Sequence, residues 1–129
     1  GRKRGALVIY GVTAAAVVCA YSFEGRVALT AALALGGFGV AAIPPLLGAF
    51  NTELFPTRLR ADAYAWANNG IGRIAYVLSP VLVGLAAESI GWGAAVRATA
   101  VFPVLALILI WIGLPETAGR ELEETAALE

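Results

Sequence analysis

Four long apolar stretches constrain the fold of this chain more than any other feature of its sequence. They cover residues 5–22, 27–50, 63–87 and 94–114, and only short polar connections separate them. A hydrocarbon core about 30 Å thick is crossed by roughly 20 apolar residues of α-helix, because each residue adds about 1.5 Å of length. Each stretch is therefore long enough to span a bilayer. The sequence predicts an all-α membrane protein with four transmembrane helices.

The composition supports this class and excludes several functions. Hydrophobic residues make up 60% of the 129 residues and charged residues 14%, whereas soluble domains carry roughly 25% charged residues. Nine basic and nine acidic residues balance each other, so we expect no nucleic-acid partner. The sequence contains no histidine, which excludes a histidine-ligated metal site and a Ser–His hydrolase. We expect no cofactor, no metal ion and no enzymatic activity.

The distribution of basic residues predicts the orientation in the membrane. With four spans, both ends of the chain lie on the same side as the connection between the second and third spans. That side carries Arg2, Lys3, Arg4, Arg58, Arg60 and Arg120, whereas the other side carries Arg26 and Arg97. Short loops rich in Lys and Arg remain cytoplasmic. We therefore expect a protein of the plasma (inner) membrane with both ends in the cytoplasm, including a tail at residues 115–129.

Three charged segments on the expected cytoplasmic side carry a family signal. They are Gly1-Arg2-Lys3-Arg4 at the start, Glu53-Leu54-Phe55-Pro56-Thr57-Arg58-Leu59-Arg60-Ala61 in the second loop, and Leu114-Pro115-Glu116-Thr117-Ala118-Gly119-Arg120 after the last span. Together they resemble the last third of a major facilitator superfamily transporter of the sugar-porter and organic-acid:proton symporter branches. The resemblance implies a single segment, residues 1–129, that forms helices nine to twelve of a twelve-helix fold. The absence of methionine also leads us to expect a longer protein.

The charges in these loops suggest a cytoplasmic gate. Glu53 ends one helix, and Arg58 and Arg60 precede the next, while Glu116 and Arg120 follow the last span. Ion pairs that form only when the cytoplasmic ends of the helices are together favour the outward-open state. The resemblance implies this gate role for Glu53, Arg58, Glu116 and Arg120. The alternative is that the basic residues only set the topology and the tail is a solvated helix.

The third apolar stretch carries a polar stripe inside the membrane. The stripe consists of Asp62, Trp66, Asn69, Arg73, Tyr76 and Pro80, which are spaced so that they share one face of an α-helix. Arg73 lies roughly 16 Å along the axis from Asp62, and a guanidinium at the bilayer centre costs at least ~2.5–3.5 kcal/mol. We therefore expect this face, with Asn68 beside it, to line a water-filled cavity or a polar seam between helices.

The roles of these polar residues remain open at this point. The resemblance implies that helices ten and eleven line the central cavity, which makes Arg73 a candidate contact for substrate or coupling ion. Arg73 can equally form a structural pair with a carboxylate elsewhere in the transporter. Asn69 can contact substrate or form an ordinary hydrogen bond between helices.

The second apolar stretch contains the candidate hinge residues Gly39, Pro44 and Pro45, with further glycines nearby. Proline removes backbone hydrogen bonds and bends a helix, and glycine permits the close approach of a neighbour. We expect these residues to interrupt the helix, either as a hinge for alternating access or as a static packing groove. Sugar porters usually carry a tryptophan after this proline, whereas here Leu46 and Leu47 follow.

These features predict secondary active transport of a small solute by alternating access. The missing tryptophan and the buried arginine favour proton-coupled symport of a small organic anion over a hexose. A sugar porter or a drug efflux pump of the same superfamily is the nearer alternative. A membrane scaffold subunit that binds partner helices and transports nothing is the alternative of a different class. The expected partners are the substrate, a proton, the remaining helices of the transporter and the lipid bilayer.

Overall fold

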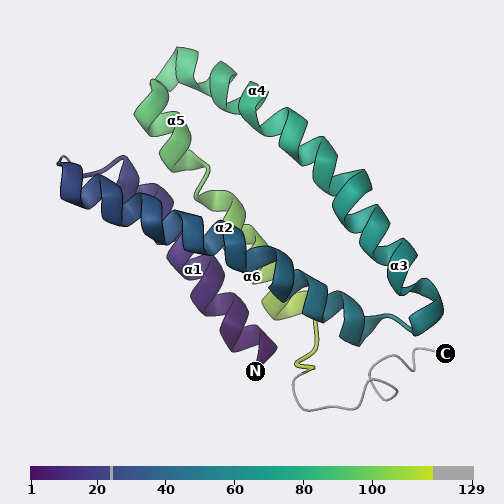
Figure 1. Cartoon of the computed structure of the whole chain (residues 1–129). Coiled ribbons are helices and arrows are strands. Elements are labelled where there is room, and N and C mark those ends of the chain that lie inside the picture. Colours follow the sequence, from purple (N-terminus) through teal and green to yellow (C-terminus); the bar gives the residue numbers. More distant parts are fainter. Residues whose placement is uncertain (24, 118–129) are drawn as a thin grey trace.

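The computed structural model describes residues 1–23 and 25–117, and this part of the chain is helical almost throughout. Figure 1 shows long helices joined by short turns. In chain order they are α1 (Arg2–Ala20), α2 (Arg26–Leu54), α3 (Thr57–Ala65), the π-helical turn η1 (Trp66–Ile71), α4 (Gly72–Ile90), α5 (Trp92–Ala98) and α6 (Val101–Gly113).

Four helical segments are long and apolar enough to cross a membrane. They are Arg2–Ala20, Arg26–Leu54, Thr57–Ile90 and Trp92–Gly113. The four helical segments contain the four apolar stretches almost completely, and the helices extend further into the charged connections. The predicted class, an all-α protein with four membrane-spanning helices, is confirmed.

The core lies where α1 packs between α2 and α6. Its buried side chains are Ala6 and Tyr10 from α1, Leu46 and Phe50 from α2, and Ile110 from α6. Apolar side chains drive little association in lipid, since the tails are as apolar as leucine, so close packing of the helix surfaces holds such an interface together. This three-helix unit is the compact part of the fold.

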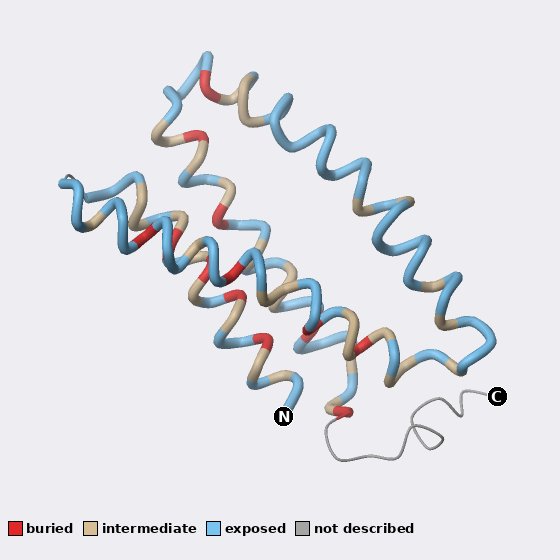
Figure 2. Tube along the Cα trace, viewed as in Figure 1, coloured by how far each residue is buried: buried red, intermediate tan, exposed pale blue. Residues whose placement is uncertain are grey.

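The third span stands apart from this unit. The segment α3–η1–α4 meets the rest of the chain mainly at its two ends, through α2 on one side and α5 on the other. Figure 2 shows exposed residues along nearly its whole length. Tyr76 is 79% exposed and Ile71 is 72% exposed. In the described part of the chain, the long faces of the third span are therefore not covered by extensive helix packing.

The second span is continuous, contrary to the expectation that its prolines and glycines interrupt it. α2 runs through Pro44 and Pro45 without a break. Gly39 is buried against α1, and a Cβ atom added to it would lie only 2.0 Å from the Thr13 Oγ1 atom. That hydroxyl donates a 2.7 Å hydrogen bond to the Ile9 carbonyl. Gly39 therefore allows α1 and α2 to pack closely, as the packing-groove alternative requires.

The fourth span is divided where a single helix was expected. α5 ends at Ala98 and α6 begins at Val101, and short-range bonds such as Phe102 N–H to the Thr99 carbonyl, 3.0 Å long, join them. Pro103 explains the division, because its ring has no N–H and would clash with the carbonyl four residues earlier in a regular helix.

Candidate functional site

Three segments that are distant in sequence meet at one end of the helix bundle: the start of α1, the end of α2 and the residues after α6 (Figure 1). The Arg2 guanidinium forms an ion pair with the Glu53 carboxylate. Its Nε atom lies 2.9 and 3.2 Å from the two carboxylate oxygens, and its Nη2 atom lies 2.5 Å from Oε1. The Glu53 side chain is 12% exposed and that of Arg2 is 44% exposed. The pair therefore lies at the margin of the packed helices.

The segment after α6 completes this cluster. Glu116 accepts hydrogen bonds from the backbone N–H groups of Arg2, at 2.6 Å, and Lys3, at 3.2 Å. The first N–H groups of a helix have no partner within the helix and carry a partial positive charge, so a carboxylate is well suited to cap them. The Thr117 hydroxyl donates to Glu53, and Thr117 is only 2% exposed.

Lys3 binds the end of α6 directly. Its ammonium group donates a 2.8 Å hydrogen bond to the Trp111 carbonyl and lies 5.8 Å from the centre of the Trp111 ring. A cation near a helix C-terminus and over an aromatic ring is favourable on both counts. We call Arg2, Lys3, Glu53, Glu116 and Thr117 the end cluster. It holds together three of the four spans.

The end cluster contains two of the expected gate residues and three residues that were not assigned to the gate. Glu53 and Glu116 belong to it, but the ion pair of Glu53 is formed with Arg2. The guanidinium of Arg60 donates a long 3.4 Å hydrogen bond to the Phe55 carbonyl, and its buried Nε atom has no hydrogen-bond partner within the described residues.

The structure places one of the two other expected gate residues. Arg58 is exposed near the start of α3, and Arg120 lies outside the described residues. The sequence signal for Arg2 and Lys3 is the opening basic motif, Gly1-Arg2-Lys3-Arg4.

A π-helical turn divides the polar stripe of the third span. In η1 the backbone bonds run from one residue to the fifth before it, so this turn accommodates an additional residue. Everything after the turn is consequently rotated by about 100° relative to a continuous α-helix. The prediction of a single face assumed an uninterrupted α-helix, and the π turn breaks that assumption between Trp66 and Arg73.

Polar residues of the third span line two different hollows. Asn68 and Tyr76 face α2, where they line a cavity of about 160 Å³ together with Ile43, Pro44, Leu47, Asn51, Tyr64 and Ala67. Asn69 and Arg73 line an open and otherwise apolar hollow on another side of the helix, with Gly70, Ile74, Val77 and Leu78. The Trp66 ring lies along Gly70 and lines neither. Asn51 and Tyr64 were not predicted, because no sequence signal pairs them across two spans.

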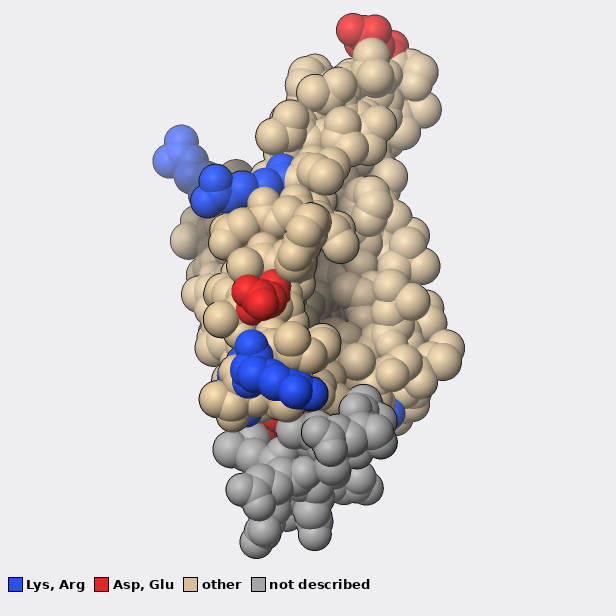
Figure 3. Space-filling model, turned by 90° about the vertical axis from the view of Figure 1, so that its right-hand side faces the viewer, with Lys and Arg blue, Asp and Glu red and all other residues tan. Residues whose placement is uncertain are grey.

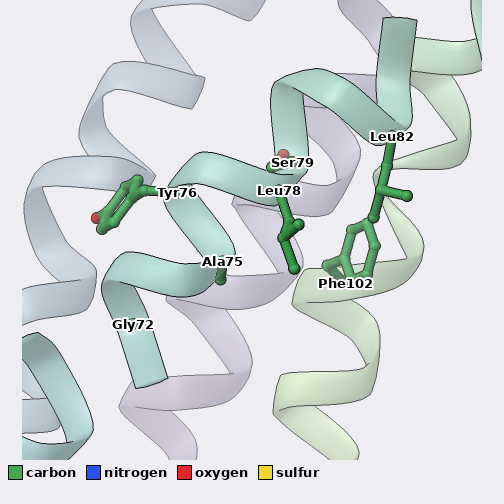
Figure 4. A pocket seen from close by; sticks show the side chains of 7 residues that line it. All are labelled: Gly72, Ala75, Tyr76, Leu78, Ser79, Leu82 and Phe102. Atoms are coloured by element: carbon green, nitrogen blue, oxygen red, sulfur yellow. The ribbon is translucent and has the colours of Figure 1, made fainter. Parts of the chain in front are cut away.

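A third, apolar hollow of about 480 Å³ lies between α4 and α6. Figure 4 shows Leu78 and Leu82 near Phe102, while Tyr76 points to the other side, toward the α2 cavity. Small residues of α4, namely Gly72, Ala75 and Ser79, leave this space open. Its lining has no charged side chain and offers lipid or an apolar side chain a place to pack.

Charged side chains are few on the face shown in Figure 3. They form separate groups with uncharged surface between them, and the middle of this face is recessed. Among residues 1–23 and 25–117, no group of three or more His, Cys, Asp or Glu side chains could hold a metal ion. The described polar features are the ion-paired end cluster and the two hollows beside the third span.

The family model described as Major Facilitator Superfamily matches residues 1–128. The chain belongs to the major facilitator superfamily. No curated protein and no solved structure matched it. Members of the superfamily are membrane transporters rather than enzymes. Four apolar helices and this membership together make the chain an integral membrane protein of a transporter family, with a small molecule as the substrate class and lipid as its surroundings.

Proposed function

We propose that this chain supplies helices nine to twelve of a proton-coupled symporter for a small organic anion, in the sugar-porter and organic-acid:proton symporter branch. The observation that carries the transport mechanism is the end cluster. It connects the three charged segments that carry the family signal, and it does so at one end of the bundle. We place this end in the cytoplasm of the plasma (inner) membrane, because the basic residues concentrate there.

The end cluster acts as part of the cytoplasmic gate in this proposal. Its bonds link the spans when their cytoplasmic ends are together, and opening toward the cytoplasm requires breaking some of them. Arg58, Arg60 and Arg120 are the further gate residues of this proposal, and their role is to supply positive charge to the gate. Since an equilibrium shifts only by differential stabilisation of its two states, these bonds favour the outward-open state.

Arg73 is the proposed contact for the substrate carboxylate, with Asn69 beside it in the same hollow. A guanidinium at midspan can bind a carboxylate with two parallel hydrogen bonds. Asn68 and Tyr76 supply uncharged donors and acceptors in the neighbouring cavity. Gly39 packs α2 against α1, and the hinge in this proposal is a bend at Pro44 and Pro45 that leaves α2 continuous, with Pro44 lining this cavity.

Ligand-dependent thermal stability tests the role of Arg73. The purified transporter would be heated with acetate, lactate, benzoate or glucose, as wild type, as Arg73→Lys and as the control Arg97→Lys. Lysine keeps the charge but loses the planar fork, so we expect Arg73→Lys alone to lose stabilisation by the carboxylates, corresponding to ~1–3 kcal/mol of binding. Full stabilisation of Arg73→Lys would exclude Arg73 from the site, and stabilisation by glucose alone would favour a sugar porter.

Cysteine labelling from each side of the membrane tests the topology. Single cysteines replacing Ser22 and Thr57 in a Cys19→Ala background lie at opposite ends of the spans. We expect an impermeant maleimide to label Thr57→Cys only from the cytoplasm and Ser22→Cys only from outside. Labelling of both from one face would contradict the four-span arrangement, and a reversed pattern would move the gate to the outer side. A scaffold subunit would show the same topology without ligand stabilisation.

A further inference from the structure

The π turn η1 is not imposed by its own sequence. The Gly72 N–H donates to the Ala67 carbonyl, five residues earlier. No proline occurs within Trp66–Ile71, and in an α-helix the same N–H would bond to the carbonyl of Asn68. Gly72 also leaves room for the Ala67 carbonyl, since a Cβ atom at this position would lie 3.0 Å from that oxygen. Both helical forms are therefore open to this segment.

The π turn decides which residue of α4 faces α2. Tyr64 and Tyr76 are 12 residues apart, so a continuous α-helix would place them about 120° apart. The additional residue accommodated by η1 reduces this angle to about 20°, and both tyrosines line the same cavity as Asn68. In a continuous α-helix Ala75, one position earlier, would occupy the place of Tyr76.

Little in the described structure opposes a rotation of α4. Its long faces lack extensive contacts with α1, α2 and α6, and its packing is with η1 and α5. Val77 is 70% exposed on one side. The connection to α5 passes through Gly91, whose φ of +81° is favourable for glycine but not for other residues. A rotation of α4 would therefore be taken up at Gly91.

We propose that η1 is a register switch between π-helical and α-helical forms. Conversion to the α form turns α4 by about 100°, removes Tyr76 from the α2 cavity and places Ala75 there. The same turn moves Arg73 further from the face that meets α2. The π form thus assembles the polar cavity of Asn51, Tyr64, Asn68 and Tyr76, and the α form dismantles it. The switch rests on the proposed function only for the existence of two transport states.

Paired cysteines in the intact transporter test the two registers without any substrate. In a Cys19→Ala background, Leu47→Cys on α2 would be combined with Tyr76→Cys, which reports the π form, or with Ala75→Cys, which reports the α form. Leu47→Cys with Val77→Cys is the matched control, because Val77 faces away from α2 in both registers. We expect both reporting pairs to be cross-linked by a short bifunctional reagent, each to a higher yield than the control pair.

Deletion of Ala67 supplies the second arm. The deletion removes the additional residue that the π turn accommodates. A continuous α-helix in this variant therefore still directs position 76, and not position 75, toward α2. We expect the Tyr76→Cys pair to persist in this variant and the Ala75→Cys pair to fall to the level of the control.

The switch is refuted if the Ala75→Cys pair never exceeds the control in the undeleted protein, or if the deletion leaves that pair unchanged. The result in the undeleted protein decides the matter if the deletion variant does not fold. Cross-linking reports helix register alone, so its failure leaves the proposed transport of an anion standing. Failure of ligand stabilisation likewise leaves the switch standing.

Discussion

Under the proposed gate mechanism, replacing Glu53 by glutamine is expected to open the end of the transporter that carries the end cluster. Glu53 is the centre of the end cluster, because it accepts from Arg2 on α1 and from Thr117 after α6. An amide keeps the size of the side chain but removes its charge and one of its two acceptor oxygens. The variant therefore loses the ion pair and can keep only part of the hydrogen bonding.

The size of the effect follows from the exposure of the pair. Ion pairs in full contact with solvent contribute about 0.2–1 kcal/mol, and hydrogen bonds to charged groups about 1.5–3 kcal/mol. Arg2 is 44% exposed and Glu53 only 12%, so solvent screens the pair from the arginine side and places it nearer the weaker class. If the pair forms only in the closed state, its loss changes the ratio of the two states several-fold.

Labelling of a cavity residue measures this change. Leu47 lines the cavity between α2 and the third span, and in Cys19→Ala inside-out vesicles an impermeant maleimide reaches Leu47→Cys from the cytoplasmic side. We expect its labelling rate to rise with Glu53→Gln and with Arg2→Gln, but the double variant to add little to either. Glu88→Gln, near the opposite end of α4, is the control. An unchanged rate in Glu53→Gln, or an equal rise in the control, would refute the gate.

Two further substitutions test individual contacts. Thr117→Val removes the hydroxyl that donates to Glu53. We expect it to raise the labelling rate of Leu47→Cys by the equivalent of about 1 kcal/mol, which is less than the effect of Glu53→Gln. An unchanged labelling rate would show that the hydroxyl does not hold the gate. Gly39→Ala places a Cβ atom against Thr13 and should lower the melting temperature in detergent, by about 1–3 kcal/mol of stability. Gly37→Ala is the control, because nothing lies within 4 Å of the added Cβ atom, and it should leave the melting temperature unchanged. Equal melting temperatures of the two variants would contradict the close contact of α1 and α2.

The membrane-spanning segments could be predicted from the sequence because length and hydropathy alone determine them. A segment in lipid must satisfy its backbone internally, so an apolar stretch of sufficient length has essentially one conformation. The same reasoning fails at helix ends. α2 continues past its apolar stretch to Leu54, because the first helix-breaking signal is Pro56, which disfavours the helical conformation of Phe55 before it.

The partners within the end cluster could not be predicted, although Glu53 and Glu116 were identified. Charge complementarity gives Glu53 several possible arginine partners in the same loops, and only the relative placement of α1, α2 and α6 selects Arg2. Capping of α1 by Glu116 is even less visible, since the donors are backbone N–H groups that any sequence possesses.

The polar stripe shows how a local backbone choice overrides a sequence pattern. The spacing of Asp62, Trp66, Asn69, Arg73 and Tyr76 fits an α-helix, but helical periodicity predicts neighbours only while the helix stays regular. One π turn changes the angle between the residues before it, Asp62 and Tyr64, and the residues after it, Arg73 and Tyr76, and it does so in the span that has the fewest contacts with the others. A segment with few packing contacts is least constrained in its register. The π turn therefore occurs in the part of the described fold whose register its neighbours constrain least.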